Sequence, residues 1–530
     1  MSVMAYMPYG AGGIIIRVET DIRRGIPGVD ISGLAEGAVR EARDRVRAAF
    51  RNSGFNFPLD RILINLAPAG LKKDGAALDL PIALSVMAAA NIVPISGNLL
   101  VMGELELSGK IRPVRGVLAA IAAGLAEGIT EFIVPAENAG EAAILASMGG
   151  HKDCRFTAVE NLQGAVHTLF IREEKGALPA SFVSISQNTK GDTLGQETEG
   201  DFADVRGQAI YKRALEIAAA GGHNVLAFGP PGAGKTMLAR RLPSIMAPLT
   251  AEEAVEVTRL YSLAGPRNDN QFLDRLITSA PFRAPHHCAS AEGILGGGRI
   301  PRPGEISLAH YGVLFLDEAP EFRINVLQAL REPLEDRVIS IVRAEGPVRL
   351  PAEFQILMTA NACPCGRLGM QTNMCFCSSD EISRYWRKFG GALLDRVEIR
   401  VGIIPPKIDE ISRRNPPDTE KSEVIARRVK AAVEIQRHRF KGTGIRRNAL
   451  LPAGKTAILC PMSEKAENAF HAAVSKLGLS GRAYHGILRV ARTIADLENK
   501  EVIETEHILE AVHHRRLGED PWDIMSISSM

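Results

Sequence analysis

The sequence lacks a long hydrophobic run, an excess of charge and a leader-like start. Its apolar stretches, such as residues 82–93 and 117–126, fall short of the ~18 residues that a membrane span needs. Lys and Arg number 63 against 61 Asp and Glu, so any nucleic-acid surface has to be local rather than a property of the whole chain. No basic and then apolar segment opens the chain. We therefore expect a cytoplasmic protein without a membrane partner.

Cysteine is also scarce, and no internal repeat is visible. Seven cysteines, an odd number with four of them between Cys363 and Cys377, favour a reducing compartment over a disulfide framework. A chain of 530 residues is long enough for about three or four domains. The hydrophobic fraction of 46% is ordinary for a globular protein. These observations predict a multidomain protein and leave its chemistry open.

Composition and periodicity divide the chain into successive parts. Residues 1–171 mix strand-like and helical segments, as an α+β domain does. Residues 172–201 are rich in Glu, Gly, Ser, Thr and Gln, which predicts a flexible linker. Residues 202–400 predict an α/β core with a parallel sheet, and residues 401–530 a helical domain. We expect strands at 13–19, 61–66, 99–107, 131–135, 224–228, 313–316 and 354–360, and helices at 34–50, 117–127, 209–220, 237–242, 479–499 and 505–516, the last two capped by Ser480 and Thr505.

The strongest motif lies between an expected strand and an expected helix. It fits the phosphate-loop pattern at every position and reads Gly229-Pro230-Pro231-Gly232-Ala233-Gly234-Lys235-Thr236. Glycines let such a loop turn its N–H groups toward a polyphosphate, and the helix N-terminus adds partial positive charge. Lys235 would then reach the β- and γ-phosphates, and the Thr236 hydroxyl would bind Mg²⁺. The motif predicts that the chain binds a nucleoside triphosphate.

Two further strand ends carry groups suited to hydrolysis. The strand at 313–316 ends in Asp317-Glu318, which would place Asp317 beside the metal and Glu318 beside an attacking water. The strand at 354–360 ends in Asn361, a side chain suited to orienting that water. The combination predicts an Mg²⁺-dependent ATP hydrolase rather than a protein that only binds nucleotide.

These motifs resemble those of the AAA+ ATPases. Longer segments resemble, more narrowly, the magnesium-chelatase-like family called YifB or ComM, namely Ala218-Ala-Ala-Gly-Gly-His-Asn224, Pro281-Phe-Arg-Ala-Pro-His-His287, Pro303-Gly-Glu-Ile-Ser-Leu-Ala-His310 and Leu479-Ser-Gly-Arg-Ala-Tyr-His485. The resemblance implies that Arg396 is an arginine finger acting on a neighbouring subunit and that Arg482 is a second sensor reaching the nucleotide. For either residue, a surface arginine paired with an acid is the alternative. The resemblance also implies a homohexameric ring that remodels DNA, by branch migration during integration of transforming DNA.

The first domain resembles the proteolytic domain of the Lon family. The similar segments are Lys73-Asp-Gly75, Gly103-Glu-Leu-Glu-Leu-Ser-Gly-Lys-Ile-Arg-Pro-Val114 and Ile133-Val-Pro-Ala-Glu-Asn138. In that family a Ser and a Lys form the catalytic dyad, and both are needed because the hydroxyl attacks only when a base removes its proton. This chain has Ala77 and Leu118 at the matching places. We expect a Lon-like domain without peptidase chemistry.

Two insertions and a cysteine cluster remain. Residues 296–304 form one insertion, and residues 337–350 predict a β-hairpin that turns at Glu345-Gly346. In related motors such hairpins reach the central pore, so Arg343, Arg349, Arg299 and Arg302 are candidates for DNA phosphates; solvated loop arginines are the alternative. The cysteine cluster consists of Cys363, Cys365, Cys375 and Cys377. These four side chains could bind one tetrahedral Zn²⁺, or they could remain free thiols.

The sequence therefore predicts an ATP-driven DNA motor, with three rival functions open. A chelatase-type motor would act on a protein partner instead of DNA. An ATP-dependent peptidase would need the missing dyad. A scaffold that uses ATP only for assembly would need a defective site, although Lys235, Asp317 and Glu318 are all present.

Overall fold

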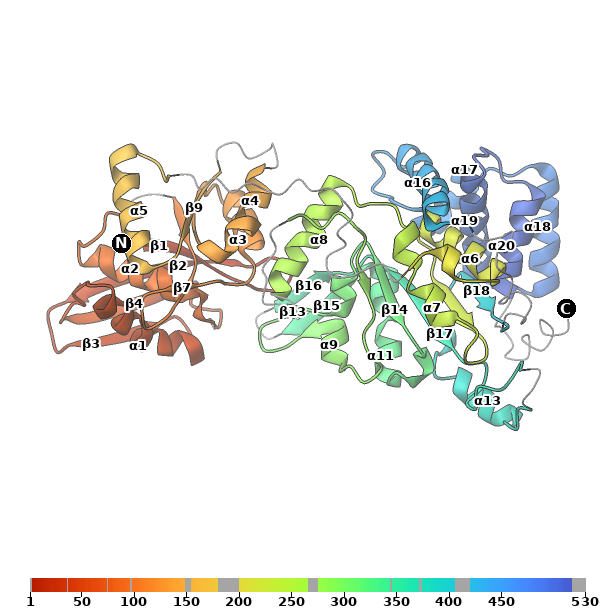
Figure 1. Cartoon of the computed structure of the whole chain (residues 1–530), viewed down its shortest axis with the longest axis horizontal. Helices are drawn as coiled ribbons and strands as arrows, with labels where there is room; N and C mark the ends of the chain where they lie inside the picture. The colour runs from red at the N-terminus through yellow and green to blue at the C-terminus, as the bar shows by residue number, and fades with distance from the viewer. Residues whose placement is uncertain are drawn as a thin grey trace.

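The chain forms an elongated molecule of three domains (Figure 1). The computed structural model describes residues 2–35, 37–73, 75–95, 98–147, 154–179, 200–265, 275–343, 346–370, 374–405 and 420–516. We call residues 2–179 the front domain, 200–405 the central domain and 420–516 the helical domain. Most of the predicted linker, 180–199, lies outside the described residues. No described helix combines the length and apolarity that a bilayer span requires.

The front domain is built on a seven-stranded mixed sheet in the order β3-β4-β2-β1-β5-β8-β9. Its strands are β1 (Ser2–Met7), β2 (Ile14–Arg23), β3 (Gly28–Ser32), β4 (Arg61–Ala67), β5 (Leu99–Val101), β8 (Glu131–Pro135) and β9 (Arg155–Val159), with a small pair β6 (Glu104–Leu105) and β7 (Ile111–Arg112). Its helices are α1 (Gly37–Asn52), α2 (Asp79–Ala89), α3 (Val117–Ala126), α4 (Ala139–Ser147) and α5 (Leu162–Lys175). The α+β prediction for this region is confirmed.

The central domain holds a five-stranded sheet in the order β11-β14-β17-β10-β18, with every neighbouring pair parallel. The strands are β11 (Phe282–Arg283), β14 (Val313–Leu316), β17 (Gln355–Ala360), β10 (Val225–Phe228) and β18 (Ile399–Gly402). All residues of β10, β14 and β17 are buried, as expected for a parallel sheet covered on both faces. Helices α6 (Ala209–Gly221), α7 (Lys235–Ala239), α8 (Ala251–Ala264), α9 (Ala291–Leu295), α10 (Glu305–Leu308), α11 (Ile324–Ala329), α12 (Arg331–Asp336), α13 (Ser379–Trp386) and α14 (Gly391–Leu394) complete it.

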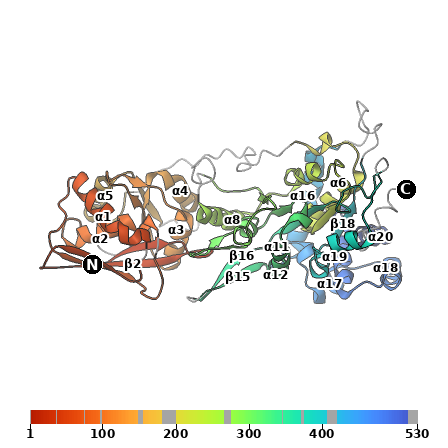
Figure 2. The ribbon, with the colours of Figure 1, turned by 90° about the horizontal axis from the view of Figure 1, so that it is seen from below.

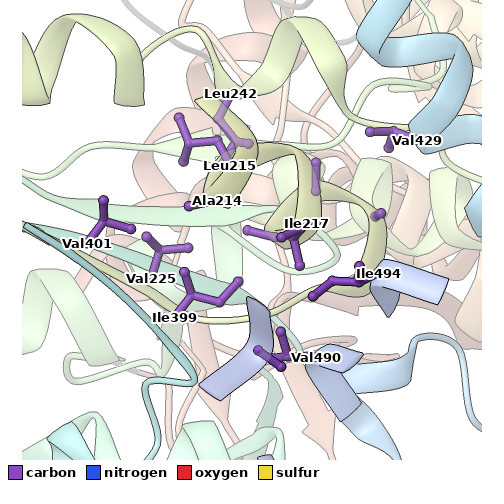
Figure 3. Packing of buried hydrophobic residues seen from close by; sticks show 14 of the residues in the cluster. Ala214, Leu215, Ile217, Val225, Leu242, Ile399, Val401, Val429, Val490 and Ile494 are labelled. Carbon is purple, nitrogen blue, oxygen red and sulfur yellow. The ribbon is translucent and has the colours of Figure 1, made fainter. Parts of the chain in front are cut away.

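The helical domain packs directly on the central sheet. It consists of α16 (Ser422–Arg439), α17 (Ala453–Leu459), α18 (Glu464–Leu477), α19 (Gly481–Leu497) and α20 (Thr505–Arg516). Val490 and Ile494 of α19 share one hydrophobic cluster with Ile217 of α6, Val225 of β10 and Ile399 of β18 (Figure 3). Helix α19 therefore forms part of the core of the central domain, which fixes the two domains to each other.

Some expected elements differ in detail. The helix after the phosphate loop, α7, begins earlier and has only five residues, and a 3₁₀ helix with Pro243 near its start follows. Thr505 is the first residue of α20 rather than its cap, and the N–H of Glu504 donates instead to Nδ1 of His507 at 2.9 Å. Strands β11 and β18 were not expected, and β18 spans the predicted boundary at residue 400.

Both insertions form antiparallel hairpins. The first hairpin pairs β12 (Gly296–Gly297) with β13 (Arg302–Pro303), and the second pairs β15 (Val338–Arg343) with β16 (Gly346–Pro351). The second hairpin extends out of the central domain on the side of the front domain (Figure 2). The predicted hairpin pairing is present. Of the predicted turn at Glu345-Gly346, Gly346 is the first residue of β16, and Glu345 lies outside the described residues.

The front and central domains share buried contacts. Leu263 of α8 belongs to the same hydrophobic cluster as Val117, Leu118 and Ile121 of α3. Beside it, the N–H of Gly116 donates to the carbonyl oxygen of Ser262 at 3.0 Å. The Ser262 hydroxyl donates to the buried carboxylate of Glu141. The contact is therefore both apolar and hydrogen-bonded, which holds the front domain in a defined orientation.

Candidate nucleotide-binding site

The phosphate loop follows β10, at the edge of the sheet where the parallel strands end. A Cβ on Gly229 would lie only 2.1 Å from the carbonyl oxygen of Ile403, directly after the neighbouring strand β18. Only glycine fits there. Gly232 and Gly234 adopt φ values of +75° and +86°, a left-handed region that side chains rarely enter. The predicted strand-loop-helix context is thus present, and the glycines are required by its geometry.

Lys235 is almost fully buried at the start of α7, with 8% of its surface exposed. Its ammonium donates to the carbonyl oxygens of Gly229 (2.8 Å) and Pro230 (2.9 Å) and to Oδ1 of Asn361 (3.2 Å). Burial lowers the pKa of Lys235 to about 8, partly offset by the negative charges of Asp317 and Glu318. The ammonium is therefore still mostly protonated at neutral pH and held inside the loop, where it can bind phosphate oxygens.

A hydroxyl and a carboxylate meet beside the loop. The Thr236 hydroxyl donates to Oδ1 of Asp317 at 2.9 Å, although the two residues lie on different elements, α7 and the end of β14. Hydroxyl and carboxylate oxygens are the ligands that Mg²⁺ takes in phosphate-loop ATPases. The exposed side chain of Glu318 follows directly, and its backbone adopts a left-handed conformation with φ of +51°.

Sequence reasoning missed two residues that support this site. Thr359 of β17 donates through its hydroxyl to Asp317 (2.6 Å) and accepts from the N–H of Glu318 (2.9 Å). A hydroxyl residue directly after the apolar run Ile356-Leu-Met358 of this strand was the available signal. Gln208 donates to the carbonyl oxygens of Ala233 (3.1 Å) and Ile404 (2.6 Å), and nothing in the sequence pattern predicted that contact.

The two predicted arginines lie together, away from the phosphate loop of their own chain. The side-chain amide of Asn224, directly before β10, donates to the carbonyl oxygen of Arg396 at 2.8 Å, so Arg396 lies at the opposite end of that strand from the loop. The carboxylate of Glu335 in α12 forms salt bridges with the guanidinium groups of both Arg396 and Arg482. Its Oε1 lies 3.1 Å from Nη2 of Arg482. Arg482 therefore lies beside Arg396, and its role toward a nucleotide stays a prediction.

These arginines line a cavity of about 550 Å³ between the central and helical domains. Arg489 and Arg515 line it too, as do the carboxylates of Glu353 and Glu398. Among the described residues, the buried Nε atoms of Arg396, Arg489 and Arg515 have no hydrogen-bond partner. Glu335 and Asp395 also line the cavity, so its walls carry charges of both signs.

The candidate DNA arginines do not share one face. In the second hairpin, Arg349 lies opposite Ser340, and both side chains are on the solvent-facing side. Arg343 is on the other side of the hairpin, the side that carries the buried Ile339. Arg343 donates to the carbonyl oxygen of Gly298 at 2.8 Å and so joins the two hairpins. Arg299 and Arg302 lie on the first hairpin, both exposed. The structure thus gives Arg343 a role between hairpins and leaves Arg349 directed to solvent.

The four predicted cysteines converge, and so does a second group. Sγ atoms of Cys363, Cys365, Cys375 and Cys377 all lie within 4.8 Å of one another. The first two lie 3.4 Å apart, too far for a disulfide, in which the sulfurs are about 2.05 Å apart. His286, His287 and Cys288 also bring their ligand atoms within 4.8 Å. The cysteine cluster could bind a metal ion such as Zn²⁺.

The Lon-like region keeps a cavity but no nucleophile. A pocket of about 370 Å³ lies beside Ala77, between the front domain and the first hairpin. None of its described lining residues is Ser, Thr, Cys, Lys or His. Leu118 is fully buried in α3. The described part of this pocket therefore lacks both members of a Ser-Lys dyad.

A phosphate loop with a hydroxyl–carboxylate pair, on a five-stranded parallel sheet joined to a helical domain, defines an ATPase of the AAA+ class. Comparison with known proteins narrows the class. The family described as "Magnesium chelatase, subunit ChlI" matches residues 201–411, its C-terminal part matches 419–515, and "Subunit ChlI of Mg-chelatase" matches 18–138.

Individual relatives cover almost the whole chain. It is 40% identical to the protein YifB of Salmonella typhimurium over 506 residues, which are 95% of this chain and 94% of that protein. It is 39% identical to competence protein ComM of Haemophilus influenzae over 514 residues, 96% of each chain. The chain belongs to the magnesium chelatase ChlI family, in the group that contains YifB and ComM. A Lon protease of Solibacter usitatus is similar to 24% of the chain, at 25% identity.

Proposed function

We propose that the chain is a cytoplasmic, ring-forming motor that hydrolyses ATP to remodel DNA, with branch migration in the uptake and recombination of transforming DNA as the favoured activity. Its similarity to a protein named for competence, ComM, supports the biological setting. The observation that carries the proposal is the separation of Arg396 from the phosphate loop of its own chain. A second copy is the simplest way to bring them together, and a closed homohexamer would repeat that contact at every interface.

Each residue of the site has a definite role in the proposed hydrolysis. Lys235 binds the β- and γ-phosphates, and Thr236 with Asp317 would hold Mg²⁺. When bound, that ion neutralises charge that develops on the phosphates. Glu318 removes a proton from the attacking water, and Asn361, already within hydrogen-bond reach of Lys235, orients that water. Arg396 and Arg482, released from Glu335, would stabilise the transition-state charge in the neighbouring subunit.

The cofactor part of the proposal is Mg²⁺ at the Thr236–Asp317 pair and one Zn²⁺ at the four cysteines. The DNA part rests on the two hairpins, where Arg349 faces solvent on the second hairpin and Arg299 and Arg302 are exposed on the first. Such arginines would contact phosphates and so bind without reading base sequence.

The deciding experiment measures ATPase turnover of the purified protein alone, with single-stranded DNA and with a branched DNA junction. We expect DNA to raise turnover, the junction most, and the protein to displace or migrate strands only when ATP is hydrolysed. The second candidate, a chelatase-type motor on a protein partner, is favoured by the family to which the chain belongs. Turnover that no DNA changes would favour that candidate and contradict the DNA motor.

A further inference from the structure

Three of the four sulfur atoms are spaced nearly as a tetrahedral metal site requires, and the fourth, of Cys377, lies within 4.8 Å of each of them. Cys363 and Cys365 lie 3.4 Å apart, Cys365 and Cys375 3.6 Å, and Cys375 and Cys363 3.6 Å, measured between Sγ atoms. A tetrahedral Zn²⁺ with Zn–S bonds of about 2.3 Å separates its sulfurs by about 3.8 Å. The N–H of Leu368 donates to Sγ of Cys363 at 3.3 Å, a contact that supports a thiolate. The cluster therefore needs only small movements to close around one ion.

This cluster is attached to the nucleotide site on two sides. Cys363 follows Asn361 after a single residue, so the metal site begins where β17 ends. The turn that it makes lies against the phosphate loop, because a Cβ on Gly366 would be 3.2 Å from Cδ of Pro231 and 3.9 Å from Cγ of Asn361. A change in the position of this turn would therefore be transmitted to both residues.

The second cysteine pair is tied to a helix. Cys377 directly precedes Ser378, which caps α13 by accepting from the N–H of Glu381. At the other end of α13, the indole N–H of Trp386 donates to the carbonyl oxygen of Ala362 at 3.0 Å. An ion bound by all four sulfurs would thus join the end of β17, the phosphate loop and α13 in one unit.

Apolar packing alone does not hold the cysteine segment in place. Met374 and Phe376, which flank Cys375, are 75% and 81% exposed. Cys365 is exposed as well, and of the four cysteines only Cys363 is fully buried. A segment with so little buried surface depends on another restraint, and a metal cross-link provides one.

We propose that Zn²⁺ at these cysteines positions Asn361 and Pro231 for catalysis, so that ATP hydrolysis depends on metal loading. The inference rests on the proposed ATPase function and adds that the bound metal regulates its rate. The cysteines are positioning residues, since none of them touches the nucleotide site directly. Losing the metal displaces the amide that orients the water, whereas Lys235 and the glycines of the loop still bind ATP.

The test compares Cys365→Ser and Cys375→Ser with Cys288→Ser as the matched control. Elemental analysis of the full-length wild type should give about one Zn²⁺ per chain. In both cluster variants we expect the metal to fall to near zero and kcat to fall about tenfold or more, because small displacements of catalytic groups cost up to ~10²-fold. The Kd for ATP should stay within about twofold. Cys288→Ser should keep both metal and turnover.

Two further variants separate positioning from general damage to the fold. Cys365→His keeps a zinc ligand, so it should recover metal and most of the turnover. In an Asn361→Ala background, Cys365→Ser should lower kcat by much less than in wild type, because the residue through which the metal acts is already gone.

Three results would overturn the inference. They are wild-type kcat in a metal-free cluster variant, an unchanged effect in the Asn361→Ala background, and metal lost only from Cys288→Ser, which would assign the ion to the histidine group. In all three cases the ATPase function itself would stand. A wild type that does not hydrolyse ATP would instead contradict the proposed function, and this inference with it.

Discussion

At the scale of single residues, the site depends on contacts between strand ends that are distant in sequence. The phosphate loop, Asp317 and Asn361 were predictable because parallel strands end at one edge of a sheet, and their motifs follow apolar runs. Thr359 and Glu335 were not, because their roles depend on which side chains the fold brings opposite them. The sequence pattern therefore predicts the residues that contact a ligand better than it predicts the residues that position them.

Glu318→Gln should keep ATP affinity and lose turnover by about 10²–10⁴-fold, since the amide keeps the shape but removes the proton acceptor. Lys235→Ala should lose binding instead, because its buried ammonium has no substitute in the loop. Glu321→Gln, an exposed acid just beyond, is the control. Equal turnover in Glu318→Gln and wild type would remove Glu318 from the mechanism.

Thr359→Val should lower kcat about tenfold while ATP still binds, because Asp317 and the N–H of Glu318 both lose their partner. Thr359→Ser keeps the hydroxyl and should restore most of the activity. Steady-state turnover and nucleotide titrations measure the two effects separately. If the serine variant is as slow as the valine variant, the hydroxyl is not the reason for the loss.

ATP affinity should also depend on pH through Lys235. Burial lowers its pKa to about 8 in the free protein, and bound phosphate favours the charged form, so binding is strongest below pH 8 and weakens above it. Each pH unit above 8 should raise the Kd about tenfold. Calorimetry in two buffers of different ionisation enthalpy should detect about half a proton taken up at pH 8. A flat affinity up to pH 9.5 would contradict this account.

At the scale of elements, the sequence predicted long and strongly patterned segments and missed short ones. The second hairpin was expected from alternation and forms as expected, with Ile341 opposite Val348. Strand β11 has only two residues, too few for a pattern to be visible. Strand β18 is as long as β10 and β14, but its apolar residues are interrupted by Arg400, whereas β10 and β14 are unbroken apolar runs. The sequence did not predict on which side of the hairpin Arg343 and Arg349 lie, because that depends on the register of the two strands.

The register separates the expected effects of Arg343 and Arg349. Arg349→Ala should weaken DNA binding similarly for all sequences and reduce the salt slope by about one unit, as expected when one phosphate contact is lost. Arg343→Ala breaks the contact with Gly298, and the double variant should also uncouple hydrolysis from strand movement. Binding at several salt concentrations, with basal ATPase as the control, measures both. Strand movement at the wild-type rate in the double variant would exclude the hairpin as the DNA-gripping element.

At the scale of the whole molecule, the proposed active site is divided between copies of the chain. The phosphate loop lies at one edge of the central sheet, and Arg396 lies beyond the opposite end of β10, a strand of four residues that spans about 13 Å. In the proposed ring, each subunit would present the two halves of the site to different neighbours. Hydrolysis should consequently depend on protein concentration.

Mixing two inactive variants tests this arrangement. Arg396→Ala and Lys235→Ala should each be inactive alone, but mixed rings contain some interfaces with an intact loop on one side and an intact arginine on the other. We expect mixing to recover a fraction of the wild-type turnover. Arg396→Lys, which keeps charge but not the forked guanidinium, should recover less in the same mixture. If the mixture of Arg396→Ala and Lys235→Ala is as inactive as each variant alone, that result would argue against catalysis across subunits.

The buried contact between α3 and α8 makes the central domain dependent on the front domain. Leu263 is packed among residues of the front domain, and Ser262 is hydrogen-bonded to the buried Glu141. Deleting the front domain would leave apolar surface and an unpaired hydroxyl on α8. The Lon-like part therefore covers and anchors α8, a role that does not need a peptidase dyad.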